Sequence, residues 1–465
     1  MSIVLRENLQ PVPDSPARVP PSAKILLHVL RDLCDEPSDR GIRFENPEDG
    51  NALTLHHSWA ELYEKSRQRA CWLSTRHGIH KGDRVLLSIA NGFPFVQNFF
   101  ALWFIGAIPV PVPTPSFLER QDMAVRRVEK IASDAGACAI IASSEWTDAY
   151  TVLAARVPSI DAIISATAPM DDASPEPMIF TEPSPEDIAL LQYTSGSTTA
   201  PRGVVLTHAN LRENTFAMGR AWTIHEEDKI VGWLPLYHDL GLIGQLLTCV
   251  CLGMPLVMLS VETFLKDPLS WLRAISEHDG TISHAPNFAL ARCTKRAKRA
   301  GLPDDIDLSK WRDCILGGEF VEVDVIAAFC EAFAPVSFDS RAISPAYGLA
   351  EHCVGVTHRR FDDPMIFDRI SRARLEEGIA EPVGADDPDA VTIANVGSVV
   401  DTTTYRVVDE QGNLCGEREV GELWLAGPSV TPGYWRNQEA TEKIFTTALT
   451  DDDGAPERWL RTGDL

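Results

Sequence analysis

Short apolar segments alternate with longer amphipathic or charged segments through the first half of the chain. The apolar segments at 84–89 and 137–142 have the length of buried strands, the apolar segment at 93–105 has the length of a helix, and a charged helix is expected near 123–133. Ser58 followed by Glu61 forms a capping box at the head of a further helix, which we expect to end near Thr75. This alternation predicts α/β layers with largely parallel sheets.

The segment 193–205 reads Tyr-Thr-Ser-Gly-Ser-Thr-Thr-Ala-Pro-Arg-Gly-Val-Val and follows the apolar run 188–191. A bound triphosphate needs closely approaching backbone N–H groups, rotatable hydroxyls and a cation. Gly196 and Arg202 supply the first and the last of these. The hydroxyls come from Thr194, Ser195, Ser197 and Thr198. Because the Gly-Lys-Ser/Thr triplet of a Walker loop is absent from the sequence, the segment predicts a different phosphate loop rather than a plain surface loop.

Composition limits the partners and the compartment. The chain has 465 residues, of which 45% are hydrophobic, so it can bury several cores. A net charge of −24 argues against nucleic acid or an anionic membrane as the main partner. The ten cysteines lack metal-type Cys-x-x-Cys spacing, and the closest pair, Cys249 and Cys251, lies in an apolar run typical of reduced core residues.

The sequence contains neither a signal peptide nor a membrane span that we can identify. Residues 1–13 carry charge without an apolar stretch, and the most apolar segment, 99–112, is too short to cross a bilayer. We therefore expect a soluble, cytoplasmic protein.

Three parts follow one another along the chain. Residues 1–185 and 186–355 have α/β texture, and the second part carries the phosphate loop. Residues 356–465 become rich in strands and turns, with strands at 404–408 and 422–426. We expect an α/β fold of two layered α/β subdomains with largely parallel sheets, plus a small β-barrel-like subdomain.

Four further clusters bear on the chemistry. They are Leu-Pro-Leu-Tyr-His-Asp-Leu-Gly-Leu-Ile-Gly at 234–244, Gly-Gly-Glu at 317–319, Ala-Tyr-Gly-Leu-Ala-Glu at 346–351 and Arg-Thr-Gly-Asp-Leu at 461–465. Each has a plainer interpretation when taken alone. His238 is typical of a structural histidine, and an Asp in a turn usually binds no ligand. Tyr347 and Glu351 fit a stacking face and a Mg²⁺ carboxylate, but equally a buried ring and a surface acid.

The order of these clusters resembles the core motifs of the adenylate-forming superfamily, which includes acyl-CoA synthetases, luciferases and peptide-synthetase adenylation domains. The resemblance covers nearly the whole chain. Within the superfamily the sequence looks most like the fatty acyl-AMP ligases. The stretches that carry this closer likeness are 234–244, Phe-Leu-Lys-Asp-Pro-Leu-Ser-Trp-Leu at 264–272, Ala-Pro-Asn-Phe-Ala at 285–289 and the long segment 357–386.

The resemblance implies an activity and a set of roles. Family members condense a fatty acid with ATP to acyl-adenylate and pyrophosphate, then pass the acyl group to the phosphopantetheine thiol of a carrier protein. Residues implied to bind the phosphates are Thr194, Ser195, Gly196, Ser197, Thr198, Gly203 and the cation Arg202. Residues implied to frame the nucleoside are Gly318, Glu319, Tyr347, Gly348, Leu349 and, at the ribose, Asp464. Thr194 and Glu351 would hold Mg²⁺, and His238 would lie beside the reacting carboxylate and α-phosphate.

The substrate is expected to be apolar. The Asp with which amino-acid-activating relatives pair the substrate ammonium is not evident around residues 261–265. Side chains that suggest an apolar tunnel next to His238 are Trp233, Leu242, Ile243 and Phe288. Each buried methylene contributes about 0.8 kcal/mol, so the tail of a medium- or long-chain fatty acid can be held by burial alone.

The sequence departs from the family pattern in three places. Arg202 stands where many relatives carry Lys, and its wider planar fork changes how a phosphate is contacted. Thr199 replaces a Gly common in acyl-CoA synthetases, a change tolerated among the acyl-AMP ligases. The resemblance also implies a small C-terminal domain with a catalytic lysine, whereas this chain stops at Leu465. We therefore expect a fragment that binds ATP and acyl-adenylate but forms the adenylate slowly and transfers it poorly.

Two surface segments bear on the acyl acceptor. The resemblance implies that segment 357–386 restrains the small domain and so selects a carrier protein over coenzyme A; the plainer interpretation is a passive insertion. The basic run Lys-Arg-Ala-Lys-Arg at 295–299 is typical of a solvated helix face, with docking of an acidic carrier protein as a second hypothesis. A fatty acyl-CoA synthetase and a catalytically silent adenylate-binding domain are the alternative functions.

Overall fold

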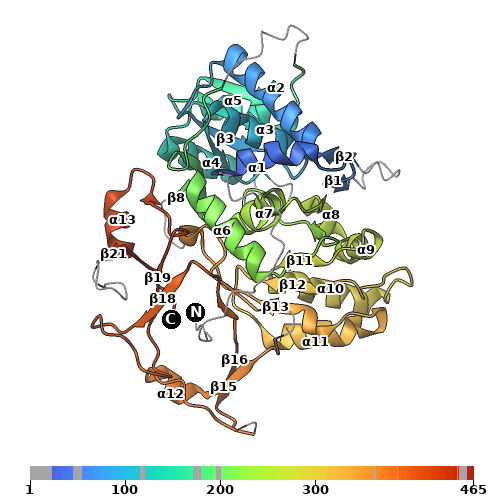
Figure 1. The fold of residues 1–465 in the computed structure, drawn as a ribbon, viewed down its shortest axis with the longest axis vertical. Coiled ribbons are helices and arrows are strands. Elements are labelled where there is room, and N and C mark those ends of the chain that lie inside the picture. The colour runs from blue at the N-terminus through green and yellow to red at the C-terminus, as the bar shows by residue number, and fades with distance from the viewer. Residues whose placement is uncertain are drawn as a thin grey trace.

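Strands and helices alternate through most of the chain, as the sequence predicts. The structure is a computed structural model that describes residues 24–45, 55–115, 121–170, 180–194, 201–359, 363–384, 386–447, 449 and 458–465. Figure 1 shows a blue-to-cyan N-terminal layer at the top, a green-to-yellow middle part, and orange-to-red C-terminal strands to the lower left. Among the described residues, no helix combines the length and the apolar character needed to cross a bilayer.

The N-terminal layer is a four-stranded parallel sheet with helices on both faces. In spatial order its strands are β4 (Ile108–Pro111), β3 (Arg84–Ser88), β5 (Ala139–Ala142) and β6 (Ala162–Ser165). Its helices are α2 (Trp59–His77), α3 (Phe93–Ile105), α4 (Gln121–Ala135) and α5 (Thr147–Ala154). Val85 and Leu87 belong to the core that includes α3, whereas Leu86 belongs to the core that includes α4 and α5. A strand covered on both faces must be apolar throughout, which explains the unbroken apolar run.

The predicted start of α2 is confirmed. The Glu61 backbone N–H donates to Ser58 Oγ at 3.2 Å, and the Ser58 backbone N–H donates to the Glu61 carboxylate at 3.1 Å. This capping box satisfies N–H groups that the first helical turn leaves without partners. The helix then continues to His77, slightly beyond the expected end.

The second layer is a seven-stranded sheet in which, among the described strands, only the β1–β2 pair is antiparallel. In spatial order its strands are β13 (Ile343–Pro345), β12 (Asp313–Leu316), β11 (Ile282–Ala285), β9 (Ile230–Gly232), β10 (Leu256–Leu259), β1 (Gly41–Glu45) and β2 (Leu55–Ser58). The other α-helices described before residue 335 are α1 (Leu26–Asp32), α6 (His208–Ala221), α7 (Thr248–Leu252), α8 (Val261–Lys266), α9 (Leu269–Glu277), α10 (Asn287–Ala300) and α11 (Val323–Phe333), and a π-helix spans Leu240–Leu247. Because β1 pairs with β10, this sheet contains strands from both sides of the boundary expected near residue 185.

The C-terminal part consists of small antiparallel sheets. One has four strands, in the order β18 (Thr404–Val408), β19 (Glu422–Ala426), β22 (Trp459–Arg461) and β21 (Phe445–Thr446). The strands expected at 404–408 and 422–426 are thus confirmed. The expected barrel-like closure is wrong for the described strands, because β18 and β21 are open edges of this sheet. Four short strands are too few to curl into a barrel with a filled interior.

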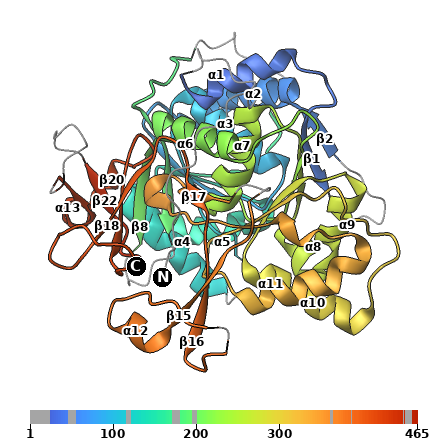
Figure 2. The same ribbon diagram turned by 60° about the horizontal axis from the view of Figure 1, so that its bottom comes forward.

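A three-stranded sheet joins the second and third parts of the chain. The hairpin strands β7 (Ile188–Thr194) and β8 (Arg202–Thr207) are antiparallel, and β20 (Gly433–Tyr434) pairs with the other edge of β8 (Figure 2). After β20, the Trp435 backbone N–H donates to the Gly203 carbonyl at 2.8 Å, and its indole Nε1–H donates to the Ala135 carbonyl at 3.2 Å. All three parts of the chain therefore meet near the turn end of the β7–β8 hairpin.

The segment 357–386 is anchored to the C-terminal part. It contains β14 (Thr357–His358), β15 (Phe367–Ser371) and α12 (Arg372–Glu376), and its strands pair with β17 (Ser398–Val399) and β16 (Ala390–Ala394). Arg418 Nη1 donates to Asp368 Oδ2 at 3.0 Å, and the Ala380 backbone N–H donates to the Arg418 carbonyl at 2.9 Å. The remaining helix, α13 (Gln438–Ile444), follows β20.

Candidate functional site

A cavity of ≈ 270 Å³ lies at the carboxyl ends of β12 and β13, beside the end of β7. Gly317 and Gly318 line it after β12, and residues 346–351 line it after β13. Neighbouring parallel strands end at the same sheet edge, where ligands bind in open α/β sheets. Thr194 and His238 also line the cavity. The structure thus brings together side chains from four of the sequence clusters.

Glu351 is held in this cavity by a residue that the sequence analysis missed. The Tyr434 hydroxyl donates to Glu351 Oε1 at 2.6 Å, and the Thr431 backbone N–H donates to the Glu351 carbonyl at 3.0 Å. Burial and the Glu351 carboxylate raise the pKa of Tyr434, so the phenol stays protonated and remains a donor. The Gly-Tyr-Trp sequence at 433–435, an aromatic pair directly after a Pro-Gly turn, is the pattern that points to it.

The donor set suits Mg²⁺. The cation prefers oxygen ligands and usually bridges a carboxylate to substrate phosphates. Glu351 keeps Oε2 free of hydrogen bonds from the described residues, and Thr194 adds a hydroxyl in the same cavity. These residues therefore fit the predicted metal site.

The flanks of the phosphate loop are described, but its centre is not. Ser195, Gly196, Ser197, Thr198 and Thr199 lie outside the described residues. Thr194 and Arg202 form the last cross-strand pair of the hairpin, next to the Tyr193–Gly203 pair.

Gly203 and Arg202 lie next to aromatic rings. A Cβ at Gly203 would come within 2.8 Å of the Tyr193 ring, whose hydroxyl donates to Asp134 Oδ2 at 2.5 Å. The Arg202 guanidinium lies 5.6 Å from the centre of the Tyr434 ring and does not line the cavity. Arg202 thus contacts the ring that bonds Glu351, and its catalytic role stays a prediction.

His238 forms a charged pair at the cavity wall. Its Nδ1 lies 2.7 Å from Asp239 Oδ1. Desolvation at the wall disfavours the imidazolium, but the Asp239 carboxylate outweighs this effect and raises the pKa of His238. A histidine whose protonated form is favoured by a neighbouring carboxylate can neutralise part of the charge that develops between a substrate carboxylate and a phosphate.

Tyr347 connects the cavity to the C-terminal cluster at 461–465. Its hydroxyl donates to Asp464 Oδ2 at 2.6 Å, and burial, together with that carboxylate, raises the pKa of Tyr347. The next residue must be a glycine, because a Cβ at position 348 would lie 1.7 Å from the Val354 carbonyl oxygen, closer than any side chain can approach. Leu349 also lines the cavity. Glu319 instead accepts a hydrogen bond from the Phe288 backbone N–H at 3.0 Å and lies outside the cavity lining.

The side chains expected to form the apolar tunnel are mostly elsewhere. Trp233 stacks on Phe264 with ring centres 3.7 Å apart, and Phe288 packs edge-on against it and is 44% exposed. Leu242 and Ile243 are fully buried in the core and do not line the cavity. Of the predicted substrate residues, His238 alone is among the described cavity-lining residues.

A different set of side chains forms the deep wall of the cavity. Its members are Met218, Trp222, His284, Ile315, Val354 and His358. Met218 and Trp222 come from the end of α6, whereas His284 and Ile315 come from adjacent strands. None of the sequence clusters predicts this wall, although a histidine inside the buried strand Ile282–Ala285 is the kind of buried polar residue that marks a site.

The chain matches the family model described as AMP-binding enzyme over residues 45–435. The long-chain-fatty-acid–AMP ligase FadD32 of Mycolicibacterium smegmatis is 31% identical over an alignment that covers 97% of this chain and 73% of that protein. The medium-chain-fatty-acid–[acyl-carrier-protein] ligase JamA of Moorena producens is 30% identical, with 88% of this chain and 69% of JamA covered.

A solved structure shows the same fold. The fatty acyl-adenylate ligase of Legionella pneumophila, in complex with acyl adenylate and pyrophosphate, matches with a TM-score of 0.85 at 29% identity, covering 95% of this chain and 75% of that one. The family model spans both α/β layers and reaches Trp435 beside the cavity. The chain therefore belongs to the AMP-binding enzyme family and is a ligase similar to the fatty acyl-AMP ligases.

Proposed function

We propose that the protein activates a medium- or long-chain fatty acid with ATP to acyl-adenylate and then transfers the acyl group to the thiol of an acyl carrier protein. The observation that carries the proposal is the single cavity in which Thr194, His238 and Glu351 face a glycine-rich strand end and a largely apolar deep wall. The name of FadD32, a fatty acid–AMP ligase, supports the adenylation step, and the name of JamA, a fatty acid–[acyl-carrier-protein] ligase, supports the transfer step.

The proposed reaction requires mainly that the fatty acid carboxylate and the α-phosphate of ATP be aligned and that their negative charges be neutralised. A carboxylate oxygen of the fatty acid forms a bond to the α-phosphorus of ATP, and the bond from that phosphorus to the pyrophosphate oxygen breaks. Both reactants are anions, so groups that hold them in line and offset charge lower the barrier most. His238 would neutralise the reacting oxygens, and Tyr347 with the Gly317–Gly318 backbone would bind adenine. Mg²⁺ held by Thr194 and Glu351 would supply Lewis-acid stabilisation of the phosphates.

We expect the purified protein to release pyrophosphate and form acyl-AMP with at least one member of a medium- to long-chain fatty acid panel. Pyrophosphate release and mass spectrometry of the adenylate measure this step, and product analysis with holo-carrier protein or coenzyme A measures the second. No adenylate with any acid would contradict the proposal and favour a silent adenylate-binding domain. Faster thioester formation with coenzyme A than with the carrier would favour a fatty acyl-CoA synthetase.

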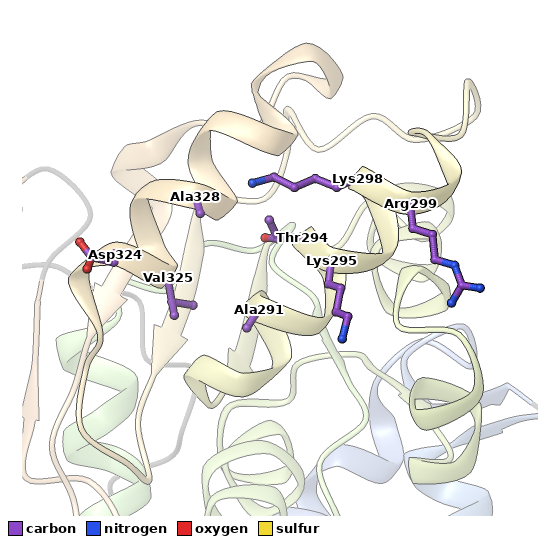
Figure 3. Close-up of a pocket in the computed structure, with 8 residues that line it drawn as sticks. All are labelled: Ala291, Thr294, Lys295, Lys298, Arg299, Asp324, Val325 and Ala328. Atoms are coloured by element: carbon purple, nitrogen blue, oxygen red, sulfur yellow. The ribbon is translucent and has the colours of Figure 1, made fainter.

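We also propose that a groove between α10 and α11 contacts the carrier protein. The groove, ≈ 550 Å³ in volume, has Ala291, Thr294, Val325 and Ala328 among its lining residues, with Lys295, Lys298 and Arg299 along α10 (Figure 3). Figure 3 shows Lys298 extending toward α11, whereas Arg299 points away. Among the described residues, the groove is lined by these three cations and by one carboxylate, that of Asp324 on α11, and this excess of positive charge on a chain of net charge −24 suits an acidic partner such as a carrier protein.

Reversing the charges of Lys295, Lys298 and Arg299 to Glu should lower kcat/KM for carrier acylation by roughly 10-fold and leave adenylate formation unchanged, because steering acts on encounter. The loss should shrink as salt is raised. A matched triple reversal of Lys65, Arg67 and Arg76 on α2, in the other α/β layer, provides the control. Equal effects of the two triple variants would remove this docking site.

A further inference from the structure

The deep wall of the cavity lies below the strand ends at which the nucleotide is proposed to bind. Ile315 lies on β12 two positions before Gly317, which places it about 7 Å back from that glycine along the strand. His284 on β11 is the direct register partner of Ile315. Both residues line the cavity. If the carboxylate of a fatty acid lies beside His238, its acyl chain would therefore extend into the cavity and reach His284.

His284 is buried without a hydrogen-bond partner among the described residues. It is 1% exposed, and neither Nδ1 nor Nε2 makes a hydrogen bond. Its ring packs edge-on against Trp222, with centres 5.1 Å apart. Buried polar atoms in native proteins are almost always satisfied by protein, water or ligand. An unsatisfied imidazole on a cavity wall therefore indicates that its partner is a bound group.

The surroundings of His284 favour an uncharged partner. Burial lowers the pKa of His284 to about 3, so the ring is neutral near pH 7 and offers one N–H donor and one acceptor. His358, which also lines the cavity, has Nε2 3.2 Å from Oδ2 of Asp313, and Asp313 is 1% exposed. A buried carboxylate behind the wall disfavours an anion such as the second carboxylate of a diacid.

We propose that the deep wall recognises a hydroxyl or keto oxygen carried on the acyl chain, with His284 as its hydrogen-bond partner. The proposal rests on the proposed fatty acid activation and narrows its substrate class to oxygenated fatty acids. A plain alkyl chain would cover the ring with methylenes and leave both ring nitrogens without hydrogen-bond partners. Because unpaired buried polar groups cost binding free energy, the site should bind such a chain more weakly than one that carries an oxygen.

Binding of non-hydrolysable acyl-sulfamoyl-adenosines by calorimetry tests the proposal without requiring turnover. One series keeps the chain length fixed and moves a single hydroxyl along the chain, and the plain acyl compound is its reference. We expect one position to bind about 10-fold tighter than the plain chain, the size of one well-placed buried hydrogen bond. Equal binding of plain and hydroxylated chains would overturn the proposal and assign the partner of His284 to water.

Two variants assign the effect to the imidazole. His284→Phe should abolish the preference for the hydroxylated compound, and His284→Gln, which keeps a donor and an acceptor, should retain part of it. A preference that survives in His284→Phe would overturn the role of this residue. If the Phe variant does not fold, the compound series on the unaltered chain still decides. Binding of no compound at all would overturn the proposed function itself.

Discussion

Replacing Glu351 with glutamine is expected to lower the rate of ATP-dependent pyrophosphate release by about 10²- to 10³-fold, as the loss of one preorganised electrostatic group does elsewhere. The side chain keeps its shape and its hydrogen bond from Tyr434 but loses the charge proposed to hold Mg²⁺. Pyrophosphate release measured across a Mg²⁺ titration, with the preferred fatty acid saturating, tests the prediction. Unchanged rates in Glu351→Gln would exclude the carboxylate from the reaction.

Tyr434→Phe is the matched variant, because it preserves the Glu351 charge and removes only its 2.6 Å hydrogen bond. We expect about a 10-fold lower rate, consistent with one lost charge-assisted hydrogen bond. Half-saturation should need more Mg²⁺, since the carboxylate loses its fixed orientation. A purely structural role for Tyr434 would lower stability without moving the Mg²⁺ dependence.

The largest stability effect is expected from Arg312→Ala, which should lower the free energy of unfolding by about 3–5 kcal/mol because it leaves a buried carboxylate unpaired. Arg312 Nε donates to Asp228 Oδ1 at 3.0 Å, and Asp228 is 1% exposed. The same guanidinium donates to the Thr223 carbonyl at 3.2 Å, next to Trp222 of the deep wall. Urea unfolding measures the loss, and acyl-adenylate binding should weaken with it.

The effect has a defined pH dependence. Burial alone would raise the pKa of Asp228, but hydrogen bonds and charge from Arg312 outweigh it and hold this pKa below its usual value. The pair therefore stabilises the fold at and above the ordinary carboxyl range and loses that contribution as the pH falls through the lowered folded pKa. The gap between wild type and Arg312→Ala should close in acid.

Lys310→Ala provides the control for this prediction. Lys310 pairs with Asp279 at 2.8 Å, but the side chains are 63% and 54% exposed. Such exposed pairs contribute about 0–1 kcal/mol. If Arg312→Ala were no more destabilising than Lys310→Ala, the buried pair would not be a stabilising element.

Local sequence predicts the elements of this fold well. The helix at 93–105 and the strands at 404–408 and 422–426 have the predicted bounds. The patterns that predict them lie within the elements themselves and in the residues that flank them. The order of the clusters also predicts which of them meet, since Thr194 and Glu351 line one cavity. Each of these features follows either from a few neighbouring residues or from the order in which the family's motifs occur along the chain.

Features that depend on distant contacts are not readable in this way. Pairing of β1 with β10 follows from tertiary packing and not from any local pattern. An apolar side chain such as Leu242 gives the same sequence pattern whether it fills the core or lines a tunnel. Glu319 is predicted to frame the nucleoside, and the sequence gives no sign that its carboxylate accepts a hydrogen bond from the Phe288 backbone N–H in the first turn of α10. The turn at 432–435 draws attention to Tyr434, but the contact of its hydroxyl with Glu351 follows only when β20 pairs with β8.

The meeting of three chain parts near the turn end of the β7–β8 hairpin also orders events during synthesis. Tyr434 follows Glu351 by 83 positions, and Trp435 follows Ala135 by 300. At a translation rate of about 5–20 residues per second, the last contact becomes possible roughly 15–60 s after Ala135 has been made. Until then β8 lacks one neighbour and keeps an open edge. The cavity proposed to bind the nucleotide is therefore completed late, and a chain that lacks β20 still exposes the strand edge that a chaperone would protect.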